Sequence, residues 1–352
     1  MNTLILTINP GSTSTKIGLF DGEALLFKES IEHHDEFKHL GSIMEQSPLR
    51  KKLILKFLEQ HGYAPEQFAC VMGRGGLLPP VHAGGYLVNE KMKQYLCSAD
   101  APQHASNLGA ILADEIAQLG SGSAYIYDAV SANEFTEIAK ITGMPEIVRK
   151  SFYHVLNSRA AAIRFAASQN KAYGDMNLIV AHLGGGITIG VHEKGRITDS
   201  LSDDNGPFAP ERAGSLPLIE VIKMCYSGKY PQKEMEKKIR GMGGLQALLG
   251  TADCRKIEAM IQDGDERARL VFEAQAYQIA KGIGLLAPVL KGKCDAIILT
   301  GGVAHSKFII ERVNEYVQFI APVKVMPGEF ELEALAAGGL RILEGKEEAH
   351  EF

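Results

Sequence analysis

The sequence predicts an α/β protein made of two halves with the same architecture. Short apolar runs of strand length alternate with longer runs of helical periodicity, which is typical of sheets covered by helices. A strand, a glycine-rich turn and a returning strand occur twice, because Gly11 and Gly22 recur as Gly184 and Gly195 at the same offset. A chain of 352 residues is long enough for two domains that each bury a core.

Each half opens on this strand, turn and strand unit. In the first half, residues 3–8 form an apolar strand, residues 9–16 a turn, and residues 17–20 a returning strand that ends at the hairpin signal Asp21-Gly22. In the second half the same unit occupies residues 177–195. A helix is expected over 47–62, and further strands are expected at 68–72, 123–128, 295–300 and 323–326.

The repeat also suggests where the domains divide. We expect a first domain over residues 1–150, completed by a returning C-terminal helix at 333–352, and a second domain over residues 151–332. Two facing halves leave a cleft between them, and clefts at domain interfaces commonly bind small ligands.

Composition narrows the classes of protein that fit. A net charge of −5, with 45% hydrophobic and 22% charged residues, is that of an ordinary globular protein. No long run of Lys and Arg offers a surface for nucleic acid or for an anionic membrane. The five cysteines form no C-x-x-C pair, and the chain shows no basic leader and no long uninterrupted apolar stretch. We therefore expect a cytoplasmic protein with small-molecule partners.

The two glycine-rich turns carry the functional hypothesis. Gly, Ser and Thr allow several backbone N–H groups and hydroxyls to point at one anion, and a lysine adds positive charge. Either turn alone is compatible with an ordinary tight hairpin, but matching turns in both halves favour a pair of phosphate-binding loops. The residues concerned are Asn9, Gly11, Ser12, Thr13, Ser14 and Lys16 in the first turn and Gly184, Gly185 and Gly186 in the second.

Three segments together resemble a known family. They are N-P-G-S-T-S-T-K at 9–16, A-H-L-G-G-G at 181–186 and T-G-G-V at 300–303, and they are similar to the acetokinase family of the actin, hexokinase and Hsp70-like ATPase superfamily. Within that family the chain looks most like the butyrate kinases. The resemblance implies duplicated ribonuclease H-like (actin-like ATPase) domains flanking a central cleft, with the acceptor and phosphate in the first domain and the nucleotide in the second.

The same resemblance implies an activity. It is the reversible transfer of the γ-phosphoryl group of ATP to a short-chain fatty acid such as butyrate, giving acyl phosphate and ADP, with Mg²⁺ and in a homodimer. Two alternatives stay open. One is another phosphotransferase or phosphatase of the superfamily, although a sugar kinase needs a carboxylate base where this chain offers Arg74. The other is a non-catalytic, actin-like nucleotide-binding protein.

Two arginines fit the chemistry of an anionic acceptor. A carboxylate is already ionised at neutral pH, so it needs cations and N–H donors rather than a general base. Arg74, in M-G-R-G-G, and Arg212, in P-E-R-A-G, lie in glycine-flanked segments. An arginine on a surface turn is the ordinary alternative. The resemblance implies that the two arginines hold the carboxylate and the transferring phosphoryl group.

Other site residues follow from the resemblance by position. His104 and His182 match histidines along the phosphoryl path, for which a satisfied structural histidine is the alternative, and Asp128 matches an acidic residue near Mg²⁺. Gly301 and Gly302 match the turn beside the adenosine.

Some assignments by resemblance stay ambiguous. Asn9 and Glu331 match residues beside the metal, and Glu329 is close enough to compete with Glu331. His154 matches the first histidine of a family motif, whereas Ser158 stands where the second would be.

An apolar segment follows Arg74 at residues 77–81. It suggests a pocket for the acyl chain, with Leu77 and Val81 as lining residues. A loop that lines the protein core is the alternative interpretation.

Overall fold

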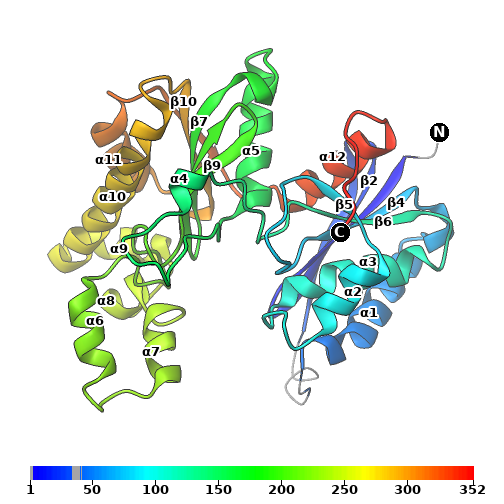
Figure 1. Cartoon of the computed structure of the whole chain (residues 1–352), viewed down its shortest axis with the longest axis horizontal. Coiled ribbons are helices and arrows are strands. Elements are labelled where there is room, and N and C mark those ends of the chain that lie inside the picture. The colour runs from blue at the N-terminus through cyan, green and yellow to red at the C-terminus, as the bar shows by residue number, and fades with distance from the viewer. Residues whose placement is uncertain (1–2, 34–39, 41) are drawn as a thin grey trace. The chain divides into compact units, whose positions relative to one another are not determined.

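The computed structural model describes residues 3–33, 40 and 42–352. The chain forms two compact units, Met1–Asn133 with Phe330–Phe352 and Glu134–Glu329 (Figure 1). The sequence analysis placed the divisions at 150 and 332 instead. Segment 134–150 belongs to the second unit because Thr136 N–H donates to Thr198 O, at 3.1 Å, and Arg149 pairs with Asp199 at 2.8 Å.

The first unit contains a six-stranded mixed sheet. The strands lie in the order β3-β2-β1-β4-β6-β5, in which β1, β4 and β6 are parallel and the other neighbours are antiparallel. Their bounds are β1 Leu4–Pro10, β2 Ser14–Asp21, β3 Ala24–Glu32, β4 Cys70–Arg74, β5 Gly85–Leu87 and β6 Ser123–Tyr127.

Helices cover both faces of this sheet. The helices of the unit are α1 (Ser47–Gln60), α2 (Glu90–Cys97), α3 (Leu108–Ala117) and α12 (Glu331–Leu343). Helices α1 and α3 share a core with the inward-facing side chains Leu6 and Ile8 of β1. On the other face, α12 approaches the sheet closely through Gly338, against Tyr127, and Gly339, against Met72.

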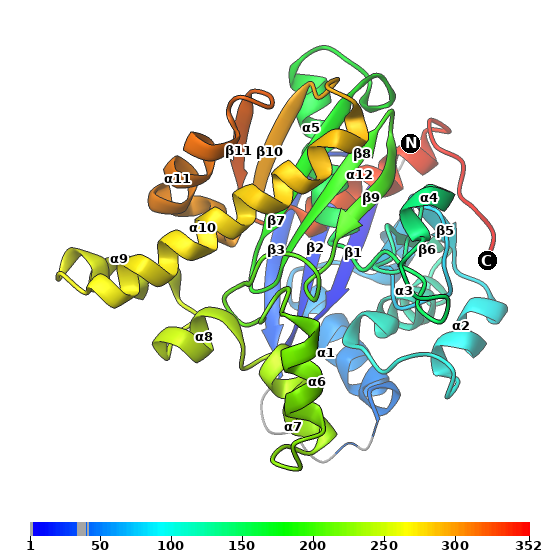
Figure 2. The ribbon, with the colours of Figure 1, turned by 60° about the vertical axis from the view of Figure 1, so that its left-hand side comes forward.

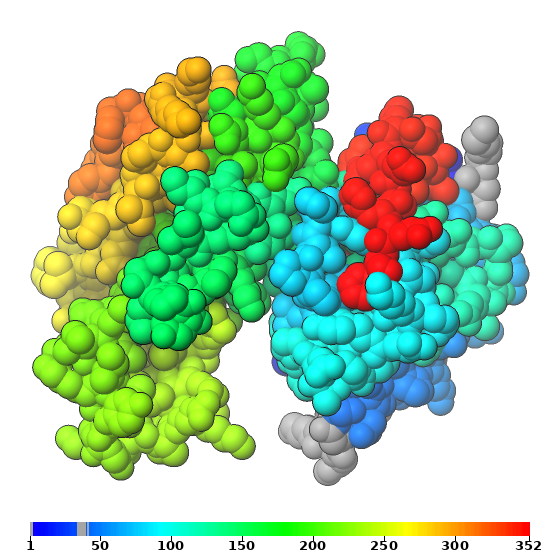
Figure 3. Space-filling model, in the orientation of Figure 1, coloured from blue at the N-terminus to red at the C-terminus, as the bar shows by residue number. Residues whose placement is uncertain are grey.

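The last residues of the chain pair with the edge strand β5. Leu87 N–H donates to His350 O at 3.1 Å, and His350 N–H donates to Gly85 O at 2.8 Å. Figure 3 shows this tail, in red, lying on the cyan segment of the first unit. The Tyr127 hydroxyl donates to the carboxylate of Glu347 at 2.7 Å, so β6 is also tied to the tail.

The second unit contains a five-stranded mixed sheet in the order β11-β10-β7-β8-β9. Its strands are β7 Asn177–Leu183, β8 Ile187–Glu193, β9 Arg196–Leu201, β10 Ala296–Gly301 and β11 Val323–Pro327. Helix α5 (Val155–Ser168) packs on one face, and α10 (Glu266–Leu286) and α11 (Lys307–Val317) pack on the other, where α10 crosses the sheet in Figure 2. The remaining helices are α4 (Glu137–Lys140), α6 (Leu218–Cys225), α7 (Gln232–Ile239), α8 (Gly244–Leu249) and α9 (Cys254–Gln262).

The two units have the same sheet topology, which confirms the duplicated α/β fold. The order β3-β2-β1-β4-β6 in the first unit corresponds to β9-β8-β7-β10-β11 in the second, with the same parallel and antiparallel pairs. The repeat read from the glycines places Leu4–Pro10 on Asn177–Leu183, which are the bounds of β1 and β7. Within the described residues, no helix is long and apolar enough to cross a membrane.

Candidate active site

In the first unit, three predicted site residues lie at the carboxyl ends of neighbouring parallel strands. Ile8 pairs with Gly73 and Arg74 pairs with Tyr127, so the register brings Asn9, Arg74 and Asp128 to one edge of the sheet. The carboxyl ends of parallel strands are where ligands bind in open α/β sheets.

Asn9, Arg74 and Glu331 form one polar cluster. Arg74 Nη1 donates to Asn9 Oδ1 at 3.3 Å and lies 3.4 Å from Glu331 Oε1, and the Asn9 amide donates to Glu331 Oε2. Glu331 is the first residue of α12, so the C-terminal helix brings this carboxylate to the strand ends. The Nε of Arg74 is buried without a hydrogen-bond partner in the described part of the chain. An unsatisfied buried N–H of this kind is uncommon in native structures, and a bound ion or water is one explanation of it.

The oxygens of this cluster fit Mg²⁺. Magnesium prefers oxygen ligands and usually takes one or two carboxylates together with waters and phosphate oxygens. Asn9 and Glu331 offer a sparse set of this kind, and no group of three or more His, Cys, Asp or Glu side chains placed for a metal occurs among the described residues. Glu329 belongs to the second unit and lines a cavity there.

His104 lies near Arg74. Its Nδ1 accepts from Ser106 N–H at 3.2 Å, which places the ring proton on Nε2. Burial, with a smaller contribution from the positive charge of Arg74, lowers the pKa of His104 below its usual value. His104 is therefore neutral at pH 7 and offers one N–H donor.

Asp128 directly follows β6 and is hydrogen-bonded to the loop at Gly84. It is 2% exposed, and its backbone adopts a φ of 46°, which is uncommon for a residue other than glycine. Its Oδ1 accepts from Gly84 N–H at 2.8 Å, and its own N–H donates to Gly84 O at 3.0 Å. Such strain is often found at functional sites.

The two residues of the expected acyl pocket lie in different surroundings. Leu77 is half-buried, and its N–H donates to Asn107 Oδ1 at 2.8 Å. Val81 forms a bridge with Ala132 and packs against the core of the first unit. The structure thus gives Val81 part of the core-lining role that was the alternative interpretation.

The first glycine-rich turn is tightly closed. Gly11 N–H donates to Ser14 O at 2.7 Å, and Ser12 and Thr13 are exposed at its tip. Lys16 pairs with Asn9 across the strands, so their side chains lie on the same face of the sheet.

In the second unit, the two predicted glycine segments lie against each other. Gly301 ends β10 with a φ of 90°, and a Cβ at this position would lie 2.5 Å from the carbonyl oxygen of Leu183, directly before the turn Gly184–Gly186. Gly301 N–H also donates to Gly328 O at 3.1 Å, and Gly328 N–H returns a bond to Gly301 O at 3.0 Å. Only glycine permits this approach.

A stacked pair of histidines lies beside this turn. The rings of His154 and His182 are 4.0 Å apart and nearly parallel, at 14°. Asn157 Nδ2 lies 2.9 Å from His182 Nδ1, so that nitrogen accepts and the proton is on Nε2, toward Gly184. His154 Cε1 would be 3.7 Å from a Cβ on Gly186.

Ser158 contributes no contact of this kind. It lies one turn into α5, and its buried hydroxyl is close to Tyr153 instead of the turn. Of the two residues left ambiguous by the sequence, His154 is the one that lies beside the turn.

Arg212 also lies beside Gly186. A Cβ on Gly186 would be 3.9 Å from Arg212 Cγ. Arg212 Nε lies 3.4 Å from Asp203 Oδ2, while Arg240 donates to Asp203 Oδ1 at 2.7 Å. The buried carboxylate of Asp203 therefore orients both arginines.

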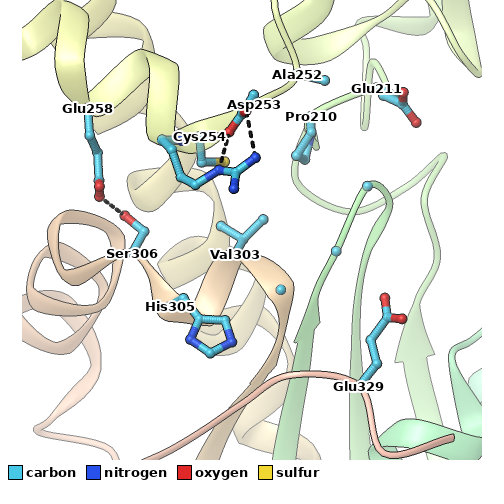
Figure 4. A pocket seen from close by; sticks show the side chains of 14 residues that line it. Pro210, Glu211, Ala252, Asp253, Cys254, Glu258, Val303, His305, Ser306 and Glu329 are labelled. Atoms are coloured by element: carbon cyan, nitrogen blue, oxygen red, sulfur yellow. Dashed lines mark hydrogen bonds and ion pairs between the residues drawn. The ribbon is translucent and has the colours of Figure 1, made fainter. Parts of the chain in front are cut away.

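A cavity of about 710 Å³ opens beside the two glycine segments (Figure 4). This volume is in the range of pockets for small ligands and cofactors. Gly184, Gly185 and Gly302, which the sequence analysis singled out, lie in its wall. Residues that it missed complete the lining: Pro210, Glu211, Ala252, Asp253, Cys254, Arg255, Glu258, Val303, His305 and Ser306.

Two of the missed residues are helix caps. Asp253 caps α9 through Arg255 N–H at 3.0 Å, and Ser306 caps α11 through Ile309 N–H at 3.2 Å. The Ser306 hydroxyl donates to Glu258 at 2.5 Å, which joins the two helices at the cavity wall. The capping residues are visible in the sequence as local signals, but their convergence on one cavity is not.

Comparison with known proteins gives a consistent result. The model of the acetokinase family matches residues 144–325. An acetate kinase from Porphyromonas gingivalis superposes with a TM-score of 0.80 and 20% identity, covering 97% of this chain and 100% of that one. An acetate kinase from Entamoeba histolytica gives 0.78 and 18%, covering 95% and 98%, and a propionate kinase from Francisella tularensis gives 0.76 and 17%, covering 96% and 98%. At these identities the structural likeness concerns the fold.

The contact between Gly301 and Leu183 gives a test of the site's architecture. Gly301→Ala is expected to lower the melting temperature by about 5 °C or more, because the Cβ clashes with backbone and the positive φ costs about 1–3 kcal/mol. Gly302→Ala is the matched control, since a Cβ there meets nothing within 4 Å. Differential scanning calorimetry of both variants measures the effect, and equal melting temperatures would contradict the described contact.

Proposed function

This chain belongs to the acetokinase family, whose members are phosphotransferases with a carboxyl group as acceptor, and from that premise we propose that it is a butyrate-type carboxylate kinase. It transfers the γ-phosphoryl group of ATP to a short-chain fatty acid such as butyrate and gives acyl phosphate and ADP, reversibly. The choice of nucleotide follows from the family, because acetate kinases use ATP and ADP. The observation that carries the proposal is the cavity of the second unit, which both predicted glycine segments line.

We place the nucleotide in that cavity. The adenosine lies between the ends of α9 and α11, and the phosphates lie along Gly184–Gly186 and Gly301–Gly302. Backbone N–H groups in glycine-rich turns bind phosphate oxygens without a side chain in the way. This assignment makes the second unit the nucleotide-binding domain and leaves the acceptor to the first.

The side chains beside the turn then act on the transferring group. Arg212 supplies a cation held in place by Asp203, and His182 supplies an Nε2–H donor toward the turn. Hydrogen-bond donors that are already in position stabilise the charge of a phosphoryl group during its transfer more strongly than water does. Neither residue needs to remove a proton, because the acceptor is ionised.

Arg74 and His104 supply the corresponding groups of the first unit. We assign Arg74 to the acceptor carboxylate, since its unpartnered Nε offers a further hydrogen bond. His104, whose pKa is lowered by burial, donates a hydrogen bond as a neutral ring. We propose that Asp128 holds the loop at Gly84 in place beside the same strand ends.

Asn9 and Glu331 are the residues that would hold Mg²⁺. When bound, the metal neutralises part of the phosphate charge. Arg74 orients both side chains through its contacts with Asn9 Oδ1 and Glu331 Oε1.

The reaction product tests the proposed activity. Incubation with ATP, Mg²⁺, butyrate and hydroxylamine is expected to yield a hydroxamate, because hydroxylamine traps acyl phosphates. Omitting butyrate is the control. ATP consumption with no hydroxamate would instead favour another phosphotransferase or phosphatase, and a sedimenting polymer without turnover would favour an actin-like protein.

The chain length of the acid tests the butyrate-type assignment. We expect kcat/KM to be higher for butyrate than for acetate by about 10²-fold or more, because butyrate has two more methylene groups and each is worth ~1–3 kcal/mol in an apolar pocket. Steady-state assays with acetate, propionate, butyrate and valerate measure it. A maximum at acetate would remove the butyrate assignment and leave the family activity in place.

Arg212 is expected to act on the chemical step. Arg212→Ala should lower kcat by about 10² or more, as expected for loss of one fixed charge donor. Arg240→Ala, which also removes a partner of Asp203 but not the side chain beside Gly186, should have a smaller effect. Equal losses in the two variants would show that the ion pairs of Asp203, not the charge of Arg212, matter.

The homodimer remains a prediction from the family. Light scattering on the purified protein measures its mass, and a monomer at micromolar concentration would contradict it.

A further inference from the structure

A buried arginine lies directly behind the first glycine-rich turn. Arg50, in the first turn of α1, is 1% exposed. Its Nη2 donates to Gly11 O at 3.0 Å, and its Nη1 donates to Ser14 O at 3.3 Å and to Thr15 Oγ1 at 2.8 Å. No motif in the sequence marks this residue.

The remaining donors of Arg50 are also used. Nε and Nη2 donate to Gln46 Oε1 at 3.2 and 2.7 Å. A guanidinium has five N–H groups in a rigid fork, and among the described residues Gly11, Ser14, Thr15 and Gln46 accept from all three of its nitrogens. The position of the turn relative to α1 is therefore fixed by a geometry that lysine cannot reproduce.

These contacts decide which groups of the turn face outward. A carbonyl that accepts from a buried guanidinium points into the protein, so the carbonyls of Gly11 and Ser14 are turned away from solvent. Ser12 and Thr13 are left exposed at the tip. Burial lowers the pKa of Arg50 to about 10, which still leaves it positively charged at neutral pH.

We propose that Arg50 is a positioning residue that holds the turn Gly11–Thr15 with the carbonyls of Gly11 and Ser14 inward and its tip toward a phosphoryl group. The identity of the anion as the terminal phosphate of ATP rests on the function proposed above. Carbonyl oxygens repel an anion, so a turn that is free to rotate them outward binds phosphate less well.

The test compares substitutions on one helix. Arg50→Met removes the charge and the fork, and Arg50→Lys keeps only the charge. Ile54→Ala, one turn further along α1 and also buried, is the matched control for lost stability without contact to the turn. Lys52→Ala, exposed on the same helix, is the control for lost charge.

We expect losses in kcat/KM for ATP that a loss of stability alone would not cause. Arg50→Met should lower kcat/KM for ATP by about 10²-fold and Arg50→Lys by about 10-fold, while Ile54→Ala lowers the melting temperature with kcat/KM within about 2-fold of wild type. In a further variant, Arg50→Ala, which leaves space for the missing group, added guanidinium ion at millimolar concentration should restore part of the activity. Kinetic losses in Ile54→Ala as large as those in Arg50→Met, or Arg50→Lys equal to wild type, would overturn the proposal.

A milder variant covers the case in which Arg50→Met does not fold. Thr15→Val removes one acceptor of Nη1 and should lower ATP affinity several-fold in isothermal titration, which needs no turnover. Unchanged affinity in both Thr15→Val and Arg50→Lys would refute the inference. A wild-type protein that binds ATP but forms no acyl phosphate would refute the proposed activity alone, because the titration still measures how the turn contributes to ATP affinity.

Discussion

Both candidate sites depend on backbones that come closer together than a side chain allows. In the first unit, a Cβ on Gly73 would lie 2.2 Å from the carbonyl oxygen of Gly109, so glycine lets α3 pack directly on β4 and fixes the position of Arg74. In the second unit, Gly301 allows the same closeness to the strand before the other turn. Glycine at Gly73 and Gly301 is thus a packing requirement at the strand ends, where the polar groups are positioned.

The polar groups at these ends are held by other side chains rather than by solvent. Asp203 orients two arginines, Asn157 selects the tautomer of His182, and Ser106 selects that of His104. Such fixed donors cost little reorganisation when an anion arrives, and partial burial strengthens their field.

The sequence predicted the features that depend on local chemistry. The two turns, their spacing and the α/β class follow from glycines and from apolar periodicity within short windows of the chain. The resemblance to a family predicted that Glu331 and Asn9 lie at the same place, although they are far apart in the sequence. Glu258 and Ser306 could not be predicted to meet, because each lies on a helix whose pattern reveals only its cap and its buried face. Segment 134–150 was misplaced for a similar reason, since its partners lie on a strand some 50 residues later.

The discontinuity of the first unit has a consequence for how the protein is made. Helix α12 covers the face of the sheet that carries Met72 and Tyr127, yet it is translated after the whole of the second unit. Synthesis proceeds at roughly 5–20 residues per second, so this apolar face stays uncovered on the ribosome for about ten seconds or longer before α12 is made. The second unit is continuous in sequence, so we expect it to complete its core before the first unit, although its synthesis begins later.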